Sequence, residues 1–222
     1  MQFPNARILI FSRLPRVGRV KTRLIPLLGD QGACEFHAAC LELTLRRILD
    51  SGLAPVELWL DRDPGSDPGL LPAVARDCPV RVQSGRDLGQ RMAHAISSAK
   101  AGGPTLLVGT DVPMLDGGYL EPALLRLAGK EVDVVMGPAE DGGYVLLGLR
   151  RARPQLFRDM PWGGDHVAAI TRERCRRLGL NLCELQTLWD LDRPEDIARL
   201  CGRTEQALHE LQALACQHLP RL

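Results

Sequence analysis

Short apolar runs alternate along the chain with longer stretches in which apolar residues recur every three or four positions. The short runs predict β-strands and the longer stretches predict amphipathic helices. Strands are expected at residues 7–11, 56–60, 80–83, 105–109, 133–137 and 144–148. Helices are expected at 33–48 with Asp30 as N-cap, at 88–100, 116–127 and 165–178, and after Pro194 through much of the C-terminus. This alternation predicts an α/β protein built around a sheet.

The fifth and sixth predicted strands are separated only by residues 138–143, which are rich in turn-forming residues. Such a connection is too short for a crossover helix and is typical of an antiparallel hairpin, so we expect a mixed sheet. The sequence contains no internal repeat and no composition shift that marks a linker. We therefore expect one domain over residues 1–222, with residues 200–222 as a helical appendage that breaks at Gly202.

Composition excludes several classes of protein. Of the 222 residues, 45% are hydrophobic and 25% are charged, as in soluble globular proteins. A net charge of +1 gives no broad attraction to nucleic acid or anionic lipid, so neither is expected as a partner. No apolar run approaches the roughly 18 residues of a membrane span, and the first residues lack the features of a signal peptide. We therefore expect a cytoplasmic protein.

The C-terminal stretch carries Leu208, Leu211, Leu214 and Leu219, which could cover either the core or a partner subunit. We expect these leucines to pack on their own domain, in a protein that is a monomer or a weak homodimer.

Seven cysteines occur at irregular spacings without any Cys-x-x-Cys pair. An odd number in this arrangement fits neither a disulfide framework nor a zinc site. We expect reduced thiols, most of them buried.

The loop after the first strand, residues 12–24, is the first candidate site. The chain has 25 arginines but only three lysines, and one of these, Lys21, lies in this loop. Open α/β sheets bind ligands at the carboxyl ends of their strands, where backbone N–H groups and basic side chains can hold phosphates. The loop matches neither the P-loop nor the dinucleotide fingerprint. The candidates for binding a phosphorylated ligand are Ser12, Arg13, Gly18, Lys21 and Arg23; alternatively, the loop is simply a solvated basic surface.

Acidic residues supply the second part of the candidate site. Asp111 follows the apolar run 105–109 and Thr110, where a divalent cation could link its carboxylate to phosphate oxygens, although a turn or N-cap role explains an Asp there equally well. Asp192 precedes the helix start at Pro194 and is a candidate N-cap, a second carboxylate for the same metal, or both. Asp141 lies in the Asp-Gly-Gly segment, which is either a plain hairpin turn or a close approach to substrate.

Other polar residues are weaker candidates. Asp87 could reach a nucleotide, but a helix cap explains it nearly as well. His37 lies on the apolar face of its helix and is expected to be packed rather than catalytic. His166 could line an acceptor side, although surface and capping histidines are common.

Taken together, these motifs resemble the nucleotide-diphospho-sugar transferase superfamily of GT-A fold. More narrowly they are similar to a bacterial family labelled glycosyltransferase, one branch of which is associated with arsenosugar biosynthesis. The matching segments, in chain order, are FSRLP (11–15), GRVKTRL (18–24), DLGQRM (87–92), GTDVP (109–113), GPAEDGGY (137–144) and DLDRPED (190–196). Two departures are the absence of a full Asp-x-Asp motif after Thr110 and the presence of Gly164 where the family usually has Thr.

The resemblance implies a Rossmann-like, three-layer α/β/α fold with a mixed, mainly parallel sheet. It implies nucleotide binding by Ser12, Arg13, Gly18, Lys21, Arg23, Asp87 and Thr110, catalytic roles for Lys21, Arg23 and Asp141, and Mg²⁺ or Mn²⁺ at Asp111 and Asp192. Asp190 or Asp141 would be the substitute if Asp192 could not reach the metal.

The expected function is a metal-dependent transferase that uses a nucleotide-sugar and a small-molecule acceptor. One alternative is a nucleotidyltransferase that joins an NTP to a phosphorylated small molecule and releases pyrophosphate, because the GRVKTRL loop resembles that class more closely. The other is a nucleotide-binding protein without catalysis.

Overall fold

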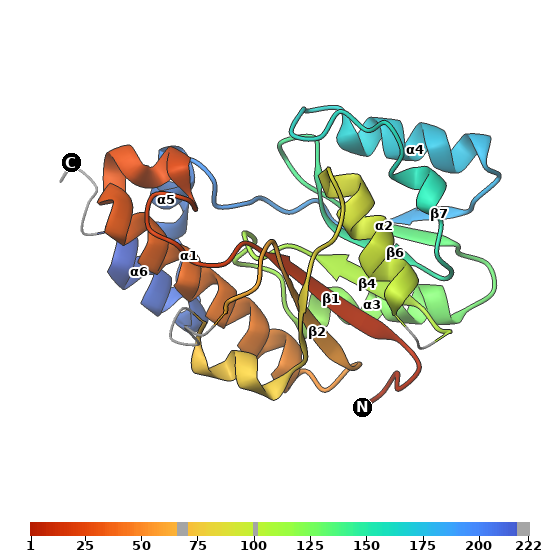
Figure 1. Cartoon of the computed structure of the whole chain (residues 1–222), viewed down its shortest axis with the longest axis horizontal. Helices are drawn as coiled ribbons and strands as arrows, with labels where there is room; N and C mark the ends of the chain where they lie inside the picture. Colours follow the sequence, from red (N-terminus) through yellow and green to blue (C-terminus); the bar gives the residue numbers. More distant parts are fainter. Residues whose placement is uncertain (66–70, 100–101, 217–222) are drawn as a thin grey trace.

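A computed structural model describes residues 1–65, 71–99 and 102–216 of the chain, which form one mixed β-sheet flanked by helices (Figure 1). The sheet has seven strands in the order β3-β2-β1-β4-β6-β5-β7. Their bounds are β1 Arg7–Ser12, β2 Val56–Leu60, β3 Val80–Val82, β4 Thr105–Val108, β5 Val134–Pro138, β6 Tyr144–Leu149 and β7 Leu182–Glu184.

Strand β6 gives the sheet its mixed character. It pairs antiparallel with both β4 and β5, whereas the other neighbouring strands pair in parallel. The predicted mixed, mainly parallel α/β sheet is therefore confirmed. The sequence pattern missed β7, because three residues at a sheet edge, none of them fully buried, are too few to show the alternation that predicts a strand.

Helices cover both faces of the sheet (Figure 1). On one face α1 (Ile25–Asp50) and α3 (Gly117–Ala128) pack against alternate side chains of the central strands, such as Ile8 and Ile10 of β1. On the other face α2 (Leu88–Ser98) and α4 (Val167–Arg177) pack against the intervening side chains, such as Leu9 and Phe11. The period of two along a strand thus produces the predicted three layers.

Local signals in the sequence explain where several helices begin. The carboxylates of Asp87 and Asp116 accept hydrogen bonds from backbone N–H groups in the first turns of α2 and α3, as N-caps do. Helix α1 begins at Ile25, earlier than predicted, and is interrupted at Gly29, where φ is +71°. Short 3₁₀ helices lie at Thr22–Leu24, Ala73–Asp77, Pro154–Leu156 and Gln206–Leu208.

The C-terminal helices α5 (Pro194–Cys201) and α6 (His209–Ala215) lie beside α1 (Figure 1). Gly202 ends α5, as predicted. Leu208 and Leu211 are buried in a separate apolar cluster with Phe36 of α1, and Trp189 and Leu191 belong to the same cluster. The appendage therefore packs on its own chain; Leu219, also predicted to pack there, lies outside the described residues.

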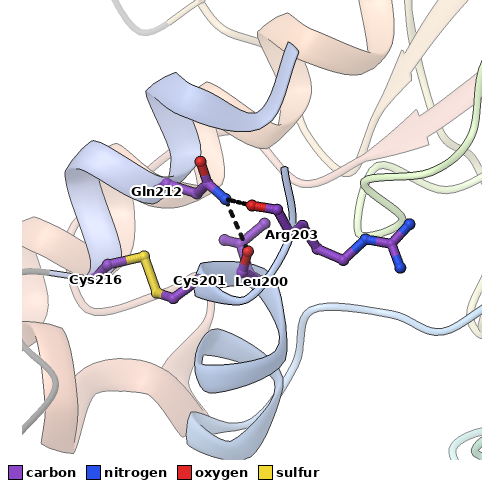
Figure 2. The surroundings of a disulfide bond; sticks show 5 residues. All are labelled: Leu200, Cys201, Arg203, Gln212 and Cys216. Carbon is purple, nitrogen blue, oxygen red and sulfur yellow. Dashed lines mark hydrogen bonds between the residues drawn. A yellow bond between two sulfur atoms is a disulfide. The ribbon is translucent and has the colours of Figure 1, made fainter. Parts of the chain in front are cut away.

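The expectation of uniformly reduced thiols is wrong for two cysteines. Cys201 at the end of α5 and Cys216 after α6 form a disulfide (Figure 2). The other five cysteines are free. Next to the disulfide, the Gln212 side chain donates hydrogen bonds to the carbonyl oxygens of Leu200 and Arg203, at 3.0 and 2.8 Å. The two short helices are thus joined both covalently and by hydrogen bonds.

The hairpin turn between β5 and β6 is held against the segment that precedes α4. Gly142 has a φ of +88°, and a Cβ atom there would lie 2.0 Å from the carbonyl oxygen of Asp165. The Gly142 carbonyl accepts a hydrogen bond of 2.9 Å from the Ala168 N–H. A glycine is therefore required at this position both for its backbone angle and for the close approach of another chain segment.

No helix in the described part of the chain is long and apolar enough to cross a membrane. This finding agrees with the lengths of the apolar runs in the sequence.

We predict that the disulfide stabilises the fold measurably. Its half-cystines are 15 positions apart, and closing a loop of that length restricts the unfolded chain by about 3 kcal/mol in the entropy model. Cys201→Ser/Cys216→Ser should lower the free energy of unfolding in urea by about that amount, whereas Cys34→Ser, at a free cysteine, should change it little. Alkylation of the denatured, unreduced protein should modify five cysteines, and modification of all seven would contradict the pairing.

We also predict that two glycines with similar backbone angles differ in their tolerance of alanine. Gly163 has a φ of +86°, and no described residue beyond its two chain neighbours lies within 4 Å of the place that a Cβ would take, so Gly163→Ala should cost about 1 kcal/mol from backbone strain alone. Gly142→Ala adds the clash with Asp165 and should cost clearly more. Denaturant midpoints of the two variants compare them directly, and equal losses of stability would refute the close packing of the turn.

Candidate active site

A cavity of about 860 Å³ opens at the carboxyl ends of β1 and β4. Ser12 at the end of β1 and Thr110 just beyond β4 line it, as does Asp111. This is the edge at which open α/β sheets bind ligands, and the volume lies within the usual range for small-molecule sites. The cavity is therefore the candidate active site.

The loop between β1 and α1 reaches this cavity through a backbone with left-handed residues. Gly18 has a φ of +70° and Lys21 a φ of +46°. A lysine in the left-handed region costs about 1 kcal/mol relative to an ordinary conformation, so the surrounding contacts must hold it there. The strained residue of the loop is thus its single lysine.

Lys21 is buried and makes its contacts with protein groups. Its side chain is 2% exposed, and Nζ lies 2.7 Å from Oδ1 of Asp111. Nζ also donates a hydrogen bond to the carbonyl oxygen of Leu191. Lys21 thus joins the first loop to the end of β4 and to the segment before α5, and the alternative of a fully solvated basic loop does not apply to it.

Asp111 presents its two carboxylate oxygens to different surroundings. Oδ1 is buried beside the Lys21 ammonium and has no hydrogen-bond partner among the described residues, so this contact is an ion pair, whereas 48% of the side chain is exposed. Burial is the largest single influence on the pKa of Asp111 and raises it, but Lys21 and other nearby groups together outweigh burial, so the net pKa is below the usual value. Burial likewise lowers the pKa of Lys21, but Asp111 and other nearby groups together make the net pKa higher than usual. Both groups are therefore charged.

The environment of Asp111 excludes one of the roles considered for it. Helix α3 is capped by Asp116, so Asp111 is not an N-cap. Its backbone carbonyl accepts a hydrogen bond of 2.7 Å from the Leu191 N–H, which holds the end of β4 next to the segment before α5. The exposed carboxylate oxygen is free to face a ligand in the cavity.

Asp192 also lines the cavity, although 81 positions separate it from Asp111 in the chain. Arg193, and not Asp192, holds the N-cap position of α5. The backbone N–H groups of Asp192 and Arg193 donate to the side chain of Asp196, at 3.0 and 2.7 Å. The Asp192 carboxylate instead forms an ion pair with Arg23. Its side chain is 33% exposed.

Two further carboxylates contribute to the negative charge of the site. Burial, followed by the charges of Asp141, Asp192 and Asp111, raises the pKa of Asp190 to about 6. Asp141 lines the cavity, and its side chain also accepts a hydrogen bond of 2.8 Å from the Gly143 N–H. It therefore stabilises the hairpin turn and lies at the cavity at the same time.

A polar network supports the floor of the cavity. Ser12 Oγ lies 3.3 Å from Thr110 Oγ1 and 3.4 Å from His37 Nε2, and all three residues are buried. His37 Nε2 lies 3.0 Å from the carbonyl oxygen of Arg13, to which it donates. Burial lowers the pKa of His37, so the ring is neutral near pH 7. The expected packed role of His37 is thus accompanied by a position at the cavity wall, which its helical spacing did not indicate.

Another part of the cavity lining is apolar and aromatic. Trp162 and Tyr144 lie edge to face with ring centroids 6.4 Å apart, and both line the cavity with Met92 of α2. Gly89 allows this arrangement, since a Cβ atom there would lie 2.9 Å from the Trp162 indole. The sequence pattern did not predict a site role for these residues, because an aromatic or methionine side chain without a polar motif is more typical of a core.

Other predicted residues lie outside the main cavity. Asp87 caps α2 through a 2.8 Å hydrogen bond from Gln90 N–H and does not line the cavity, so the geometry gives no support to the predicted nucleotide contact. His166 does not line it either, whereas Arg13 does. Gly18 lines an adjoining pocket of about 280 Å³. Four arginines also line that pocket: Arg13, Arg16, Arg19 and Arg62.

The carboxylates fit a divalent cation only in combination with a ligand. Within residues 1–65, 71–99 and 102–216, no group of three His, Cys, Asp or Glu side chains is placed to hold a metal. Mg²⁺, however, is usually held by one or two carboxylates together with substrate phosphates and water. The exposed oxygen of Asp111 and the partly exposed Asp192 are hard oxygen donors of this kind, so the residues fit a cation that arrives with a phosphate.

Solved structures share the fold over nearly the whole chain. A provisionally assigned nucleotide-diphospho-sugar transferase from Desulfovibrio desulfuricans G20 is 27% identical with a TM-score of 0.82, covering 97% of this chain and 98% of that one. A cytidylyltransferase from Leptospira borgpetersenii is 15% identical with a TM-score of 0.59, covering 96% and 94%. Glucosyl-3-phosphoglycerate synthase from Mycobacterium tuberculosis, in complex with Mn²⁺, uridine diphosphate and phosphoglyceric acid, is 10% identical with a TM-score of 0.53, covering 97% and 79%.

At these identities the last two show the fold alone. No curated protein matches the sequence. Residues 44–164 match the family described as "Uncharacterized protein conserved in bacteria (DUF2064)". Because this match spans more than half of the 222 residues, the chain belongs to the DUF2064 family.

Proposed function

We propose that this protein is a metal-dependent transferase that acts on a nucleotide substrate, with a nucleotide-sugar as donor and a small molecule as acceptor. The observation that carries the proposal is the convergence of Lys21 and Arg23 with Asp111 and Asp192 at one cavity. Basic side chains for phosphates and carboxylates for a cation are the two parts that diphosphate chemistry needs. The similarity to the Desulfovibrio protein over almost the full length supports the same interpretation.

The residues that line the cavity would have different roles in the reaction. Arg23, whose side chain is 62% exposed, is available to bind a donor phosphate, and Lys21 stabilises the carboxylate side. A divalent cation bound at Asp111 and Asp192 would neutralise the charge that develops on the departing diphosphate. Asp141 faces the cavity from the hairpin turn and is the candidate base for the acceptor hydroxyl. The wall of Trp162 and Tyr144 would exclude water from the acceptor side.

A nucleotidyltransferase is the second candidate, and the arginine-lined pocket favours it. Arg16, Arg19 and Arg62 line this pocket of about 280 Å³ beside the first loop. A nucleoside triphosphate carries one phosphate more than a nucleotide-sugar, and guanidinium groups bind phosphates well. The pocket would suit that additional group, with pyrophosphate as the product.

Ligand-dependent stability tests the shared part of the proposal. Nucleotides and nucleotide-sugars that bind the folded protein should raise its melting temperature, and more so with Mg²⁺ or Mn²⁺. Asp111→Asn and Asp192→Asn keep the side-chain shape but remove a charge, so each should weaken metal-dependent binding about tenfold, or about 1.4 kcal/mol. Asp50→Asn makes the same charge change at an exposed position outside the cavity and serves as the control. Unchanged metal-dependent binding in both cavity variants would refute the proposed cation site.

Product analysis then separates the candidates. Sugar transfer or hydrolysis from a nucleotide-sugar supports the first, and pyrophosphate release from an NTP supports the second. Tight nucleotide binding with neither reaction would identify a non-catalytic nucleotide-binding protein and overturn both.

A further inference from the structure

Both candidate metal ligands are paired with a cation from the same loop. Lys21 lies 2.7 Å from Asp111 Oδ1, and Arg23 forms an ion pair with Asp192. The two pairs differ in burial: the Lys21 side chain is 2% exposed, and that of Arg23 is 62% exposed. An exposed pair is weak because water screens it, whereas a buried charge needs its partner. Lys21 is therefore the stronger counter-ion of the two.

Lys21 is held at Asp111 by more than charge. Its backbone is fixed in the left-handed region, and Nζ donates to the Leu191 carbonyl. An ammonium group has three N–H donors, and the Leu191 carbonyl accepts from one of them. Lys21 also lines the cavity, so a ligand bound there can reach its ammonium group.

A cation that arrives alone at Asp111 meets this ammonium. Metal–oxygen bonds of about 2.0–2.6 Å would place a divalent ion on the same carboxylate that Lys21 already neutralises, and the two positive charges repel each other. A phosphate that arrives with the cation changes this balance, because it supplies negative charge to both the ammonium and the metal. Metal affinity and phosphate affinity are then coupled, and the coupling is reciprocal.

We propose that Lys21 acts as the built-in counter-ion of Asp111 and makes divalent-cation binding depend on a phosphate-bearing nucleotide. This inference rests on the proposed function, since it assumes that Asp111 and Asp192 are the cation ligands. Lys21 is a positioning residue in this scheme. It holds Asp111 and the Leu191 segment in place, and its charge lowers the affinity of the site for a metal ion that arrives without nucleotide.

Manganese binding without nucleotide tests the proposal. Mn²⁺ alone is titrated into the protein, and free Mn²⁺ is measured by electron paramagnetic resonance. The wild-type protein should bind Mn²⁺ weakly, and Lys21→Met should bind it at least about tenfold more tightly, because the carboxylate loses its internal cation. Lys21→Met/Asp111→Asn should lose this gain. Lys130→Met removes the same charge from an exposed lysine that does not line the cavity and should behave as wild type.

A second variant covers the case in which Lys21→Met fails to fold, as judged by circular dichroism. Arg23→Met removes an exposed partner and should give a smaller gain in nucleotide-free Mn²⁺ affinity through Asp192. In the wild-type protein, a panel of ADP, CDP, GDP and UDP should include a nucleotide whose affinity rises at least about tenfold with Mn²⁺.

The outcomes distinguish this inference from the proposed function. Tight, nucleotide-free Mn²⁺ binding by the wild-type protein that Asp111→Asn abolishes would leave the metal site in place but overturn the role of Lys21. No Mn²⁺ binding by wild type, Lys21→Met or Arg23→Met, with or without any nucleotide of the panel, would overturn both.

Discussion

The contact of the Lys21 ammonium with the Asp111 carboxylate and the Leu191 carbonyl is the interaction on which the cavity depends. It joins three segments that lie far apart in the sequence, and Lys21 and Leu191 alone are 170 positions apart. A buried ammonium is unfavourable unless both charge and hydrogen bonding compensate it, so the loop, the end of β4 and the segment before α5 must be assembled together. The same contact gives the cavity its distribution of charge.

The position of the second carboxylate depends on the C-terminal helices. Trp189 is 5% exposed and Leu191 is fully buried, and both lie in the apolar cluster formed by α1, α5 and α6. Asp190 and Asp192 alternate with them and are less buried. Because buried and half-buried residues alternate over these four positions, burial of the two apolar residues directs the two carboxylates away from that cluster. The C-terminal appendage therefore contributes to the site through its packing.

Short-range patterns predicted much of this architecture. Alternating strands and helices, the turn-rich segment 138–143 and Gly202 indicated the mixed sheet, the hairpin and the break between the C-terminal helices, because each signal is local. Strand β7 was missed because its pairing partner β5 determines it more than its own three residues do. The Cys201–Cys216 pair was missed because spacing alone does not show which thiols meet.

The candidate site, too, could be predicted only where the signal is local in the sequence. The ends of β1 and β4 predicted which edge of the sheet carries the cavity, and Asp111 and Asp192 both line it. The partners of Lys21 could not be predicted, since an ion pair between remote segments leaves no periodic signal. For Asp87 the sequence offered a cap and a ligand contact with similar weight, and the geometry shows the cap.

The choice of lysine at position 21 follows from the geometry around it. Glycine would relieve the left-handed backbone, but it would leave Asp111 Oδ1 buried without a counter-ion. Arginine would keep the charge, but its planar group has five N–H donors, and the acceptors that contact Lys21 Nζ are Asp111 and the Leu191 carbonyl. A compact ammonium contacts both of these groups from one point. In a chain with 25 arginines and three lysines, the lysine at this position is therefore explained by the size and donor count of its charged group.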